Sequence, residues 1–412
     1  MCQNQNMMTQ HPVFALLTNS LKKGLNQAPN LSLVYDCPEL QTFTISGVDA
    51  TTFLQGQLTQ DMVQHLPDQA KLAGYCNAQG RVLATMVLIP LPTPEPGFLC
   101  ITTASVAPAL IKRLRMFVMR SKVVLSEPFP STGLFPIQPQ DPKQSLVPSQ
   151  MQGQTQNPLQ IQVQTQVQTE AQTHASTALQ DNPGIFVVGV SSRDATALSQ
   201  SLGHDLPLAP WQMQHHLTGT WVCAPISQGH PQRWWWLAGV AQHDAVKALP
   251  PFTFGLAEEN LSPSTPSSQN LWQQLDVQAG LPWVTNATQD LFIAQTLNLD
   301  LIGAVSFTKG CYPGQEVVAR AHYRGTLKRR MYLGHIDQAI EIDLASDIFN
   351  ALNPKEPCGR VISRAVTGNR TDILFDSTIS AAQDNALCLY LNNELTEPIN
   401  IALDELPYSL NT

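Results

Sequence analysis

The chain has 412 residues, which is too long for one ordinary hydrophobic core and predicts two or three domains. Charged residues make up only 13% of it, about half the usual share of roughly 25%, and the net charge of −8 argues against a nucleic-acid-binding role for the whole surface. No apolar run reaches the roughly 18 residues that span a bilayer, and the N-terminus has neither a secretory nor a mitochondrial leader pattern. We therefore expect a cytoplasmic protein without membrane contacts or a direct nucleic-acid partner.

An N-terminal extension, residues 1–30, precedes the first region in which structure is expected, residues 31–136. The pattern of residues 31–136 is typical of mixed α+β structure, with a glycine-containing link, 78–80, that suits a hairpin. The expected elements, in chain order, are a strand at 40–45, a helix that follows a turn at 47–49 and carries Phe53, Leu54 and Leu58, hairpin strands at 70–77 and 81–89, and an amphipathic helix at 107–119.

The composition changes sharply at residues 137–182. Fourteen of the 43 residues from 138 to 180 are glutamine, and the only full charges there are Asp141, Lys143 and Glu170. Such a segment cannot bury enough apolar surface to offset the entropy lost on ordering. It is expected to be a disordered, low-complexity insert, and a glutamine-rich interaction segment is the alternative.

Structure is expected again in residues 183–329, and a C-terminal domain of short strands, typical of a small barrel or sandwich, is expected in residues 330–412. The second region contains the run Trp234-Trp235-Trp236, which could form a stacking platform, although alternation along a strand would bury at least one of the three rings. The predicted elements are strands at 184–188 and 233–240, helices at 195–202 and 271–279, and terminal strands at 332–336, 359–365 and 386–391.

The strongest chemical pattern lies at residues 308–325, where the run Lys309-Gly310-Cys311-Tyr312-Pro313-Gly314 enters a helix beginning near Gln315. A loop that enters a helix presents unpaired backbone N–H groups at the positive end of the helix dipole, which favours an anion and would favour the thiolate of Cys311. The ammonium of Lys309 would favour the thiolate further. We therefore predict a reactive thiol at Cys311 with Lys309 beside it; a buried, inert cysteine is the alternative.

Basic residues gather in the same segment. Between positions 309 and 330 there are six basic residues and one acidic residue, Glu316. A second cluster, residues 112–122, carries five basic residues and no acid. Both clusters could form a site for a polyanion, such as a glutamylated cofactor, phosphate or RNA, and the solvated face of a helix is the alternative for both.

These motifs together resemble the YgfZ-type folate-binding proteins, which are relatives of the glycine-cleavage T-protein, an aminomethyltransferase. The resemblance covers about 300 residues and leaves out the glutamine-rich insert. It rests on Lys309-Gly-Cys-Tyr-Pro-Gly-Gln-Glu316 with Arg320 and Arg324, on Asp276-Val-Gln-Ala-Gly-Leu-Pro282, on Phe53-Leu-Gln-Gly-Gln-Leu-Thr-Gln-Asp61 with Gly74-Tyr-Cys-Asn-Ala-Gln-Gly-Arg81, and on Cys358-Gly-Arg-Val361.

The resemblance implies an α+β fold of three domains around a central channel, with antiparallel sheets and a small C-terminal β-barrel. It implies tetrahydrofolate, or a polyglutamylated folate, as the ligand, and iron–sulfur client proteins and cluster-assembly factors as partners. The implied function is assembly or repair of iron–sulfur enzymes, including radical enzymes that methylthiolate tRNA. Carried over by position, Lys309 and Cys311 are the critical pair, and Lys309, Gln315, Glu316, Arg320 and Arg324 are the folate-binding residues, without a metal site.

One departure from the T-protein pattern bears on the chemistry. T-proteins carry an acidic pair shortly after the glycine turn that is Gly80-Arg81 here, and this chain has Ala84 and Thr85 instead. Folate-dependent one-carbon transfer needs an acid or base near the pterin. The chain is therefore not expected to be an aminomethyltransferase of T-protein mechanism; a one-carbon transferase or demethylase, and a non-catalytic interaction scaffold, are the two alternatives.

Overall fold

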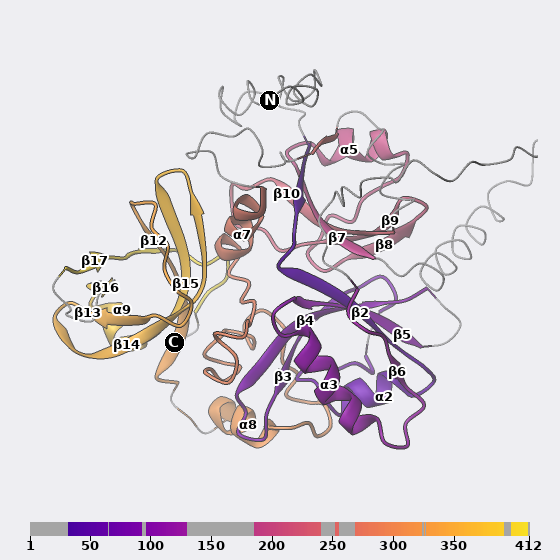
Figure 1. Ribbon diagram of the computed structural model, residues 1–412, viewed down its shortest axis with the longest axis horizontal. Helices are drawn as coiled ribbons and strands as arrows, with labels where there is room; N and C mark the ends of the chain where they lie inside the picture. The colour runs from indigo at the N-terminus through magenta and orange to yellow at the C-terminus, as the bar shows by residue number, and fades with distance from the viewer. Residues whose placement is uncertain are drawn as a thin grey trace, which may run out of the picture.

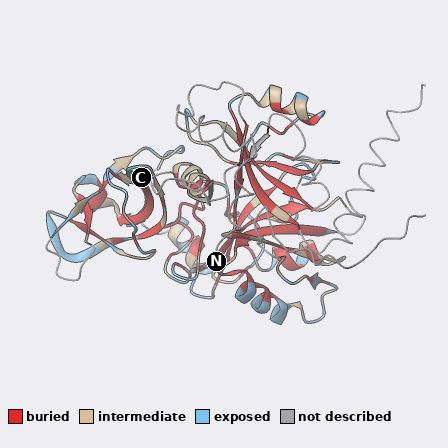
Figure 2. Cartoon of the chain, turned by 45° about the horizontal axis from the view of Figure 1, so that its top comes forward, coloured by how far each residue is buried: buried red, intermediate tan, exposed pale blue. Residues whose placement is uncertain are grey.

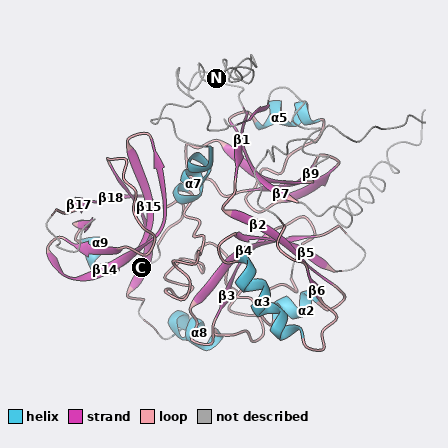
Figure 3. Cartoon of the chain, viewed as in Figure 1, coloured by secondary structure: helices cyan, strands magenta, loops and turns pink. Residues whose placement is uncertain are grey.

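The computed structural model describes residues 32–64, 66–92, 96–129, 185–239, 252–254, 268–323, 325, 327–390 and 397–410. The predicted N-terminal extension and glutamine-rich insert lie outside these residues. The described chain forms three β-sheets, with short helices on their outer faces and between them (Figures 1 and 3).

The first sheet is antiparallel and has five strands in the order β3-β4-β5-β2-β6. Successive side chains alternate between its faces, so Met86 and Leu88 pack under the helices α2 (Ala50–Gln55) and α3 (Ala107–Val118), while Val87 and Ile89 face the rest of the molecule. Its strands are β2 (Leu40–Ser46), β3 (Lys71–Cys76), β4 (Val82–Pro90), β5 (Gly97–Thr103) and β6 (Val124–Leu125).

The second sheet has six strands in the order β11-β1-β7-β10-β9-β8, and all its pairings are antiparallel except that of β1 with β11. One of its strands, β1, comes from the beginning of the described chain, so residues 31–136 contribute to both the first and the second sheet. Its strands are β1 (Ser32–Asp36), β7 (Phe186–Ser192), β8 (Met213–His216), β9 (Gly219–Cys223), β10 (Gln232–Ala238) and β11 (Phe252–Phe254), and α5 (Ala195–Leu202) packs on it.

The third sheet is C-terminal, strongly curved and barrel-like, and its order is β17-β16-β13-β14-β15-β12-β18 (Figure 1). Between it and the other two sheets lie α7 (Ser268–Gln278) and a long irregular segment, while α8 (Gln315–Tyr323) lies beside β3. Its elements are β12 (Arg329–Ile336), β13 (Asp347–Asn350), β14 (Asn353–Thr367), β15 (Arg370–Thr378), α9 (Ile379–Gln383), β16 (Leu387–Leu389), β17 (Ile399–Asn400) and β18 (Ala402–Asp404).

One hydrophobic cluster joins the three sheets, and the buried residues in Figure 2 follow it through the centre of the molecule. It contains Ile101 of the first sheet, Trp235 of the second, Leu374 of the third and Trp272 of α7. Because one continuous core holds the sheets together, a site at their junction has rigid walls.

The expected strands and helices of the described segments are confirmed, with small shifts at their ends. The helix predicted to follow the turn at 47–49 begins at Ala50, as expected, but it ends at Gln55, before Leu58. The prediction of a stacking platform at Trp234–Trp236 is wrong. None of the three residues has exposed surface, because β10 is a central strand packed on both faces. Within the described residues, the model has no helix with the length and apolar character to cross a membrane.

Candidate functional site

The signature loop, residues 308–314, packs on the hairpin turn between β3 and β4. Gly314 has φ +81° and Gly80 has φ +73°, both in the left-handed region that glycine tolerates. A Cβ atom on Gly314 would lie 2.4 Å from the Asn77 carbonyl oxygen and 2.6 Å from the Gly80 Cα. The two glycines thus allow two segments that carry the family resemblance, more than 200 residues apart, to lie in contact.

Lys309 connects the same loop to α2. Its ammonium donates hydrogen bonds of 2.5 Å to the carbonyl oxygens of Gln55 and Leu58, and it lies 4.9 Å from the centre of the Tyr312 ring. The side chain is buried, and burial lowers the pKa of Lys309 to about 8, an effect that the charge of Asp61 partly opposes. This ammonium binds the end of a helix, so the expected pairing with the Cys311 thiol is not among the contacts of the described residues.

Cys311 is exposed, as the sequence predicts, and none of the other six described cysteines is exposed. The others are buried or half-buried, and burial raises the pKa of Cys76 and of Cys223 to about 12 and raises that of Cys100 as well. A raised pKa keeps a thiol protonated and unreactive at neutral pH. Access therefore separates Cys311 from the other described thiols.

Three of the remaining predicted ligand residues lie on α8, where Gln315 is half-buried and Glu316 and Arg320 are exposed. Gln315 and Glu316 stand in its first turn, and Arg320 pairs with Glu316 at 2.6 Å, four residues apart. The Arg320 and Glu316 side chains are 68% and 83% exposed, so this is a surface ion pair of small energetic value. Arg324 lies outside the described residues.

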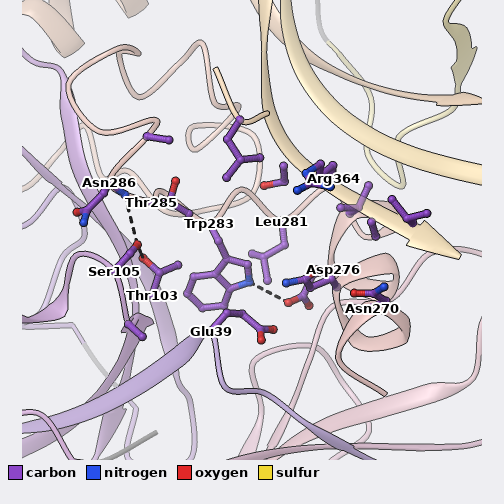
Figure 4. A pocket seen from close by; sticks show the side chains of 18 of the residues that line it. Glu39, Thr103, Ser105, Asn270, Asp276, Leu281, Trp283, Thr285, Asn286 and Arg364 are labelled. Atoms are coloured by element: carbon purple, nitrogen blue, oxygen red, sulfur yellow. Dashed lines mark hydrogen bonds between the residues drawn. The ribbon is translucent and has the colours of Figure 1, made fainter. Parts of the chain in front are cut away.

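A large pocket opens elsewhere, at the junction of the first sheet, α7 and the third sheet; we call it the junction pocket. It has a volume of about 670 Å³, within the range of about 300–1,000 Å³ that small-molecule sites occupy. Its walls come from the ends of β2 and β5, from α7, from residues 281–287 and from residues 363–366 of β14 (Figure 4). None of the described signature residues lines it.

Asp276 of α7 anchors the polar wall of the junction pocket. Its Oδ1 accepts a 2.6 Å bond from Arg233, and its Oδ2 accepts a 2.9 Å bond from the indole N–H of Trp283. Burial raises the pKa of Asp276, while the Arg233 charge and these hydrogen bonds oppose the rise. Figure 4 shows the Trp283 ring between Asp276 and Thr103, with Glu39 below it.

The lining of the pocket also holds a positive charge. Arg364 of β14 is paired with Glu341, and the Arg364 side chain is 29% exposed whereas that of Glu341 is 74% exposed. Burial lowers the pKa of Arg364, although a guanidinium remains charged at neutral pH. The pocket thus combines the carboxylates of Glu39, Asp276 and Glu341 with an indole and one half-buried cation.

The structure explains what replaces an acidic pair after the glycine turn. Thr85 is fully buried, and its hydroxyl donates to the Pro282 carbonyl at 3.0 Å and accepts from the Val284 N–H at 3.0 Å. Ala84 is also fully buried, on the side of α2 and α3. Thr85 therefore connects β4 to the segment that forms a wall of the junction pocket, and neither position offers a group that transfers a proton at neutral pH.

Sequence analysis missed the junction pocket, although it singled out residues 276–282. Asp276 and Leu281 of that stretch line the pocket, and Trp283 follows directly. The available signal for the pocket was the acidic residue Asp276 in a predicted helix, followed shortly by Trp283. Arg364 and Glu39 had none, because their neighbours in sequence carry no motif.

The chain matches no known protein-family model. A structural comparison finds similarity to aminomethyltransferase T of the glycine cleavage system from Bartonella henselae, with 12% sequence identity and a TM-score of 0.61. The match covers 92% of this chain and 86% of that chain. The protein therefore has an aminomethyltransferase-like fold, and at this identity the likeness extends to the fold alone.

Proposed function

We propose that the protein binds a tetrahydrofolate in the junction pocket and acts as an accessory factor in the assembly or repair of iron–sulfur enzymes. The observation that carries the folate part is the combination of carboxylates, an indole and a half-buried guanidinium in one pocket of suitable volume. A folate has hydrogen-bond donors on its pterin edge and carboxylates on its glutamate tail. Carboxylates beside an aromatic ring suit the first end, and a half-buried guanidinium suits the second.

The residues present fit such a ligand. Asp276 and Glu39 would accept from the pterin edge, Trp283 would provide an apolar wall, and Arg364 would meet a tail carboxylate. Arg233 and the Trp283 indole hold Asp276 in one orientation, which reduces the cost of ordering it on binding. A bound tetrahydrofolate supplies nitrogen atoms that carry one-carbon groups.

The iron–sulfur part of the proposal depends on the resemblance of the signature loop and on the accessibility of Cys311. An exposed thiol on a rigid loop can exchange with sulfur species on another protein, which a buried thiol cannot. Lys309 supports this role indirectly, because its bonds to the carbonyls of Gln55 and Leu58 fix the loop that carries the thiol. Radical enzymes that methylthiolate tRNA are the client class that the resemblance suggests.

A titration with tetrahydrofolate, followed by calorimetry, tests the folate site with two arginine variants. We expect Arg364→Gln to weaken binding about ten-fold, because a charge-assisted hydrogen bond to a carboxylate is lost. Arg320→Gln is the matched control: it removes the same charge from the signature helix, and we expect unchanged affinity. Absence of binding by the wild type, or weakening by Arg320→Gln alone, would contradict the pocket assignment.

A complementation assay tests the cellular role separately. In cells that lack the protein, Cys311→Ala should fail to restore activity of an iron–sulfur enzyme while folate affinity of the purified variant stays unchanged. Cys358→Ala, which removes a half-buried thiol far along the sequence, serves as the control. Full complementation by Cys311→Ala would disprove a role for the thiol.

One observation favours a folate-dependent transferase as a second candidate. Asp276 is a buried carboxylate with a raised pKa in a pocket, a combination that is frequent among catalytic acids and bases. Its charge is paired with Arg233, however, and Thr85 offers no second acid or base. A turnover assay with tetrahydrofolate and an aminomethyl donor decides between the two functions.

A further inference from the structure

The outer face of α3 and the turn that follows it combine positive charge with exposed apolar side chains. Residues 107–126 contain five basic residues and no acidic residue, in a chain whose net charge is −8. Arg115 forms an ion pair with Glu127 and bonds to the Leu125 and Ser126 carbonyls. The other four, Lys112, Arg113, Arg120 and Lys122, are exposed and form no ion pair with a described acidic residue.

Large apolar side chains lie among these cations. Met116 is 65% exposed, Phe117 44%, Met119 87% and Val124 67%. The opposite face of α3 already buries Leu110, Ile111 and Leu114 against the first sheet, so the outer apolar residues are additional to those that the fold needs. Methionine and aromatic residues surrounded by polar groups are typical of surfaces that bind other proteins.

A hollow lies at the edge of this outer face of α3. The hollow has a volume of about 250 Å³ and lies between β3, β4 and α3. Its floor is apolar, with Leu83 and Leu110 beside the buried ring of Tyr75, whose hydroxyl contacts Arg113. Lys112, Arg113 and Met116 form the rim. The volume is below the usual range of small-molecule sites and suits one apolar side chain.

We propose that the outer face of α3 with this hollow docks an acidic amphipathic segment of a partner protein. Carboxylates of the segment would meet Lys112, Arg113, Arg120 and Lys122, and one bulky apolar side chain would enter the hollow. Charge complementarity favours an anionic partner over a neutral one. The hollow favours a protein side chain over a lipid surface, which is flat, and the exposed methionines favour it over nucleic acid, whose phosphates gain nothing from them.

The segment 285–289 lines both the hollow of the docking face and the junction pocket. This placement suits a partner that acts together with the ligand of the pocket. Gln289 lines the hollow, and Thr285, Asn286 and Ala287 of the same segment line the junction pocket. The proposal itself does not depend on folate binding, because it rests on residues of α3, β3 and β4.

Methyl NMR of the full-length protein labelled at the methionine methyl groups tests this surface. The probe is a synthetic helical peptide with glutamates on one face and leucines with one phenylalanine on the other; the control peptide has glutamine in place of each glutamate. We expect the Met116 and Met119 signals to shift with the acidic peptide. Met86, Met213 and Met331, which are at most 1% exposed, should not move. The glutamine peptide should bind about ten-fold more weakly.

Charge reversal on the rim supplies the matched variants. Lys112→Glu with Arg113→Glu should reduce affinity for the acidic peptide at least about ten-fold. Lys355→Glu, a reversal at an exposed position of β14, should leave it unchanged. The double variant changes exposed side chains, and an unaltered urea unfolding midpoint confirms its fold.

Three results would overturn the proposal. The first is the absence of shifts at Met116 and Met119, or equal shifts with the glutamine peptide. The second is shifts of these methyl groups with phosphatidylcholine–phosphatidylserine vesicles but not with the peptide, which would assign the face to a lipid surface. The third is the same response to a short RNA duplex only, which would assign it to nucleic acid.

Discussion

The signature loop and the junction pocket are built in opposite ways. In the loop, consecutive residues carry the recognisable pattern, yet most of their contacts hold the chain together: Lys309 binds α2, and Gly314 lies against Gly80. In the junction pocket, residues from widely separated segments, from Glu39 to Val366, face one cavity. A recognisable sequence pattern can therefore mark a structural joint, while most residues that line the cavity belong to no motif.

The largest effect is expected from a side chain at the glycine contact. Gly314→Val should lower the free energy of unfolding by about 4–5 kcal/mol, because its Cβ would overlap backbone atoms at a positive φ. Gly310→Ala, in the same loop, should cost less than about 1 kcal/mol, since a Cβ there has nothing within 4 Å. Urea unfolding measures both. A small loss for Gly314→Val would show that the loop is not a joint.

The next effect concerns the wall of the pocket. Arg233→Met should destabilise the protein by about 3–5 kcal/mol, because it leaves the buried carboxylate of Asp276 without its cation. Adding Asp276→Asn should recover part of that loss, since an amide costs less to bury. The double variant should bind tetrahydrofolate more weakly than the wild type, as measured by calorimetry. Binding as tight as that of the wild type would show that Asp276 does not contact the ligand.

A pH dependence distinguishes the buried Lys309 from an ordinary surface lysine. Its pKa is lowered from 10.5 to about 8 in the folded protein, so between these values the unfolded state binds more protons. Wild-type stability should therefore rise as the pH increases from about 8 to 10.5, relative to Lys309→Met. At neutral pH the variant should lose about 1–2 kcal/mol through the two unpaired carbonyls. Parallel pH profiles of the two proteins would place Lys309 in solvent.

The smallest effect on stability is expected at the thiol. Cys311→Ala should change the free energy of unfolding by less than about 0.5 kcal/mol, because the side chain is exposed. In a Cys2→Ser background, Ellman's reagent should modify Cys311 first and rapidly, and Cys311→Ala should remove this phase. An unchanged rapid phase would show that another thiol opens to solvent.

The sequence by itself determined part of the secondary structure of the described segments: it predicts β4 and α3, but not β1, β5, β8, β9 or β15. A nearly continuous apolar run after the glycine turn predicts β4, whose Met86 and Val87 face different cores, and apolar spacing predicts α3. Local chemistry also predicts an exposed Cys311, because Gly310 and Gly314 leave little around it to bury the sulfur. The folate-binding residues expected on α8 remain a prediction, and the structure places Arg320 in a surface pair with Glu316.

Tertiary structure alone decided which groups meet. The Lys309 ammonium has its partner carbonyls 254 and 251 residues away, and Arg233 lies 43 residues from Asp276. Such pairs form only when the sheets pack on a common core, because no local spacing connects them. Folding also places the Lys309 ammonium on the carbonyls of Gln55 and Leu58, and it collects Asp276, Trp283 and Arg364 around one cavity.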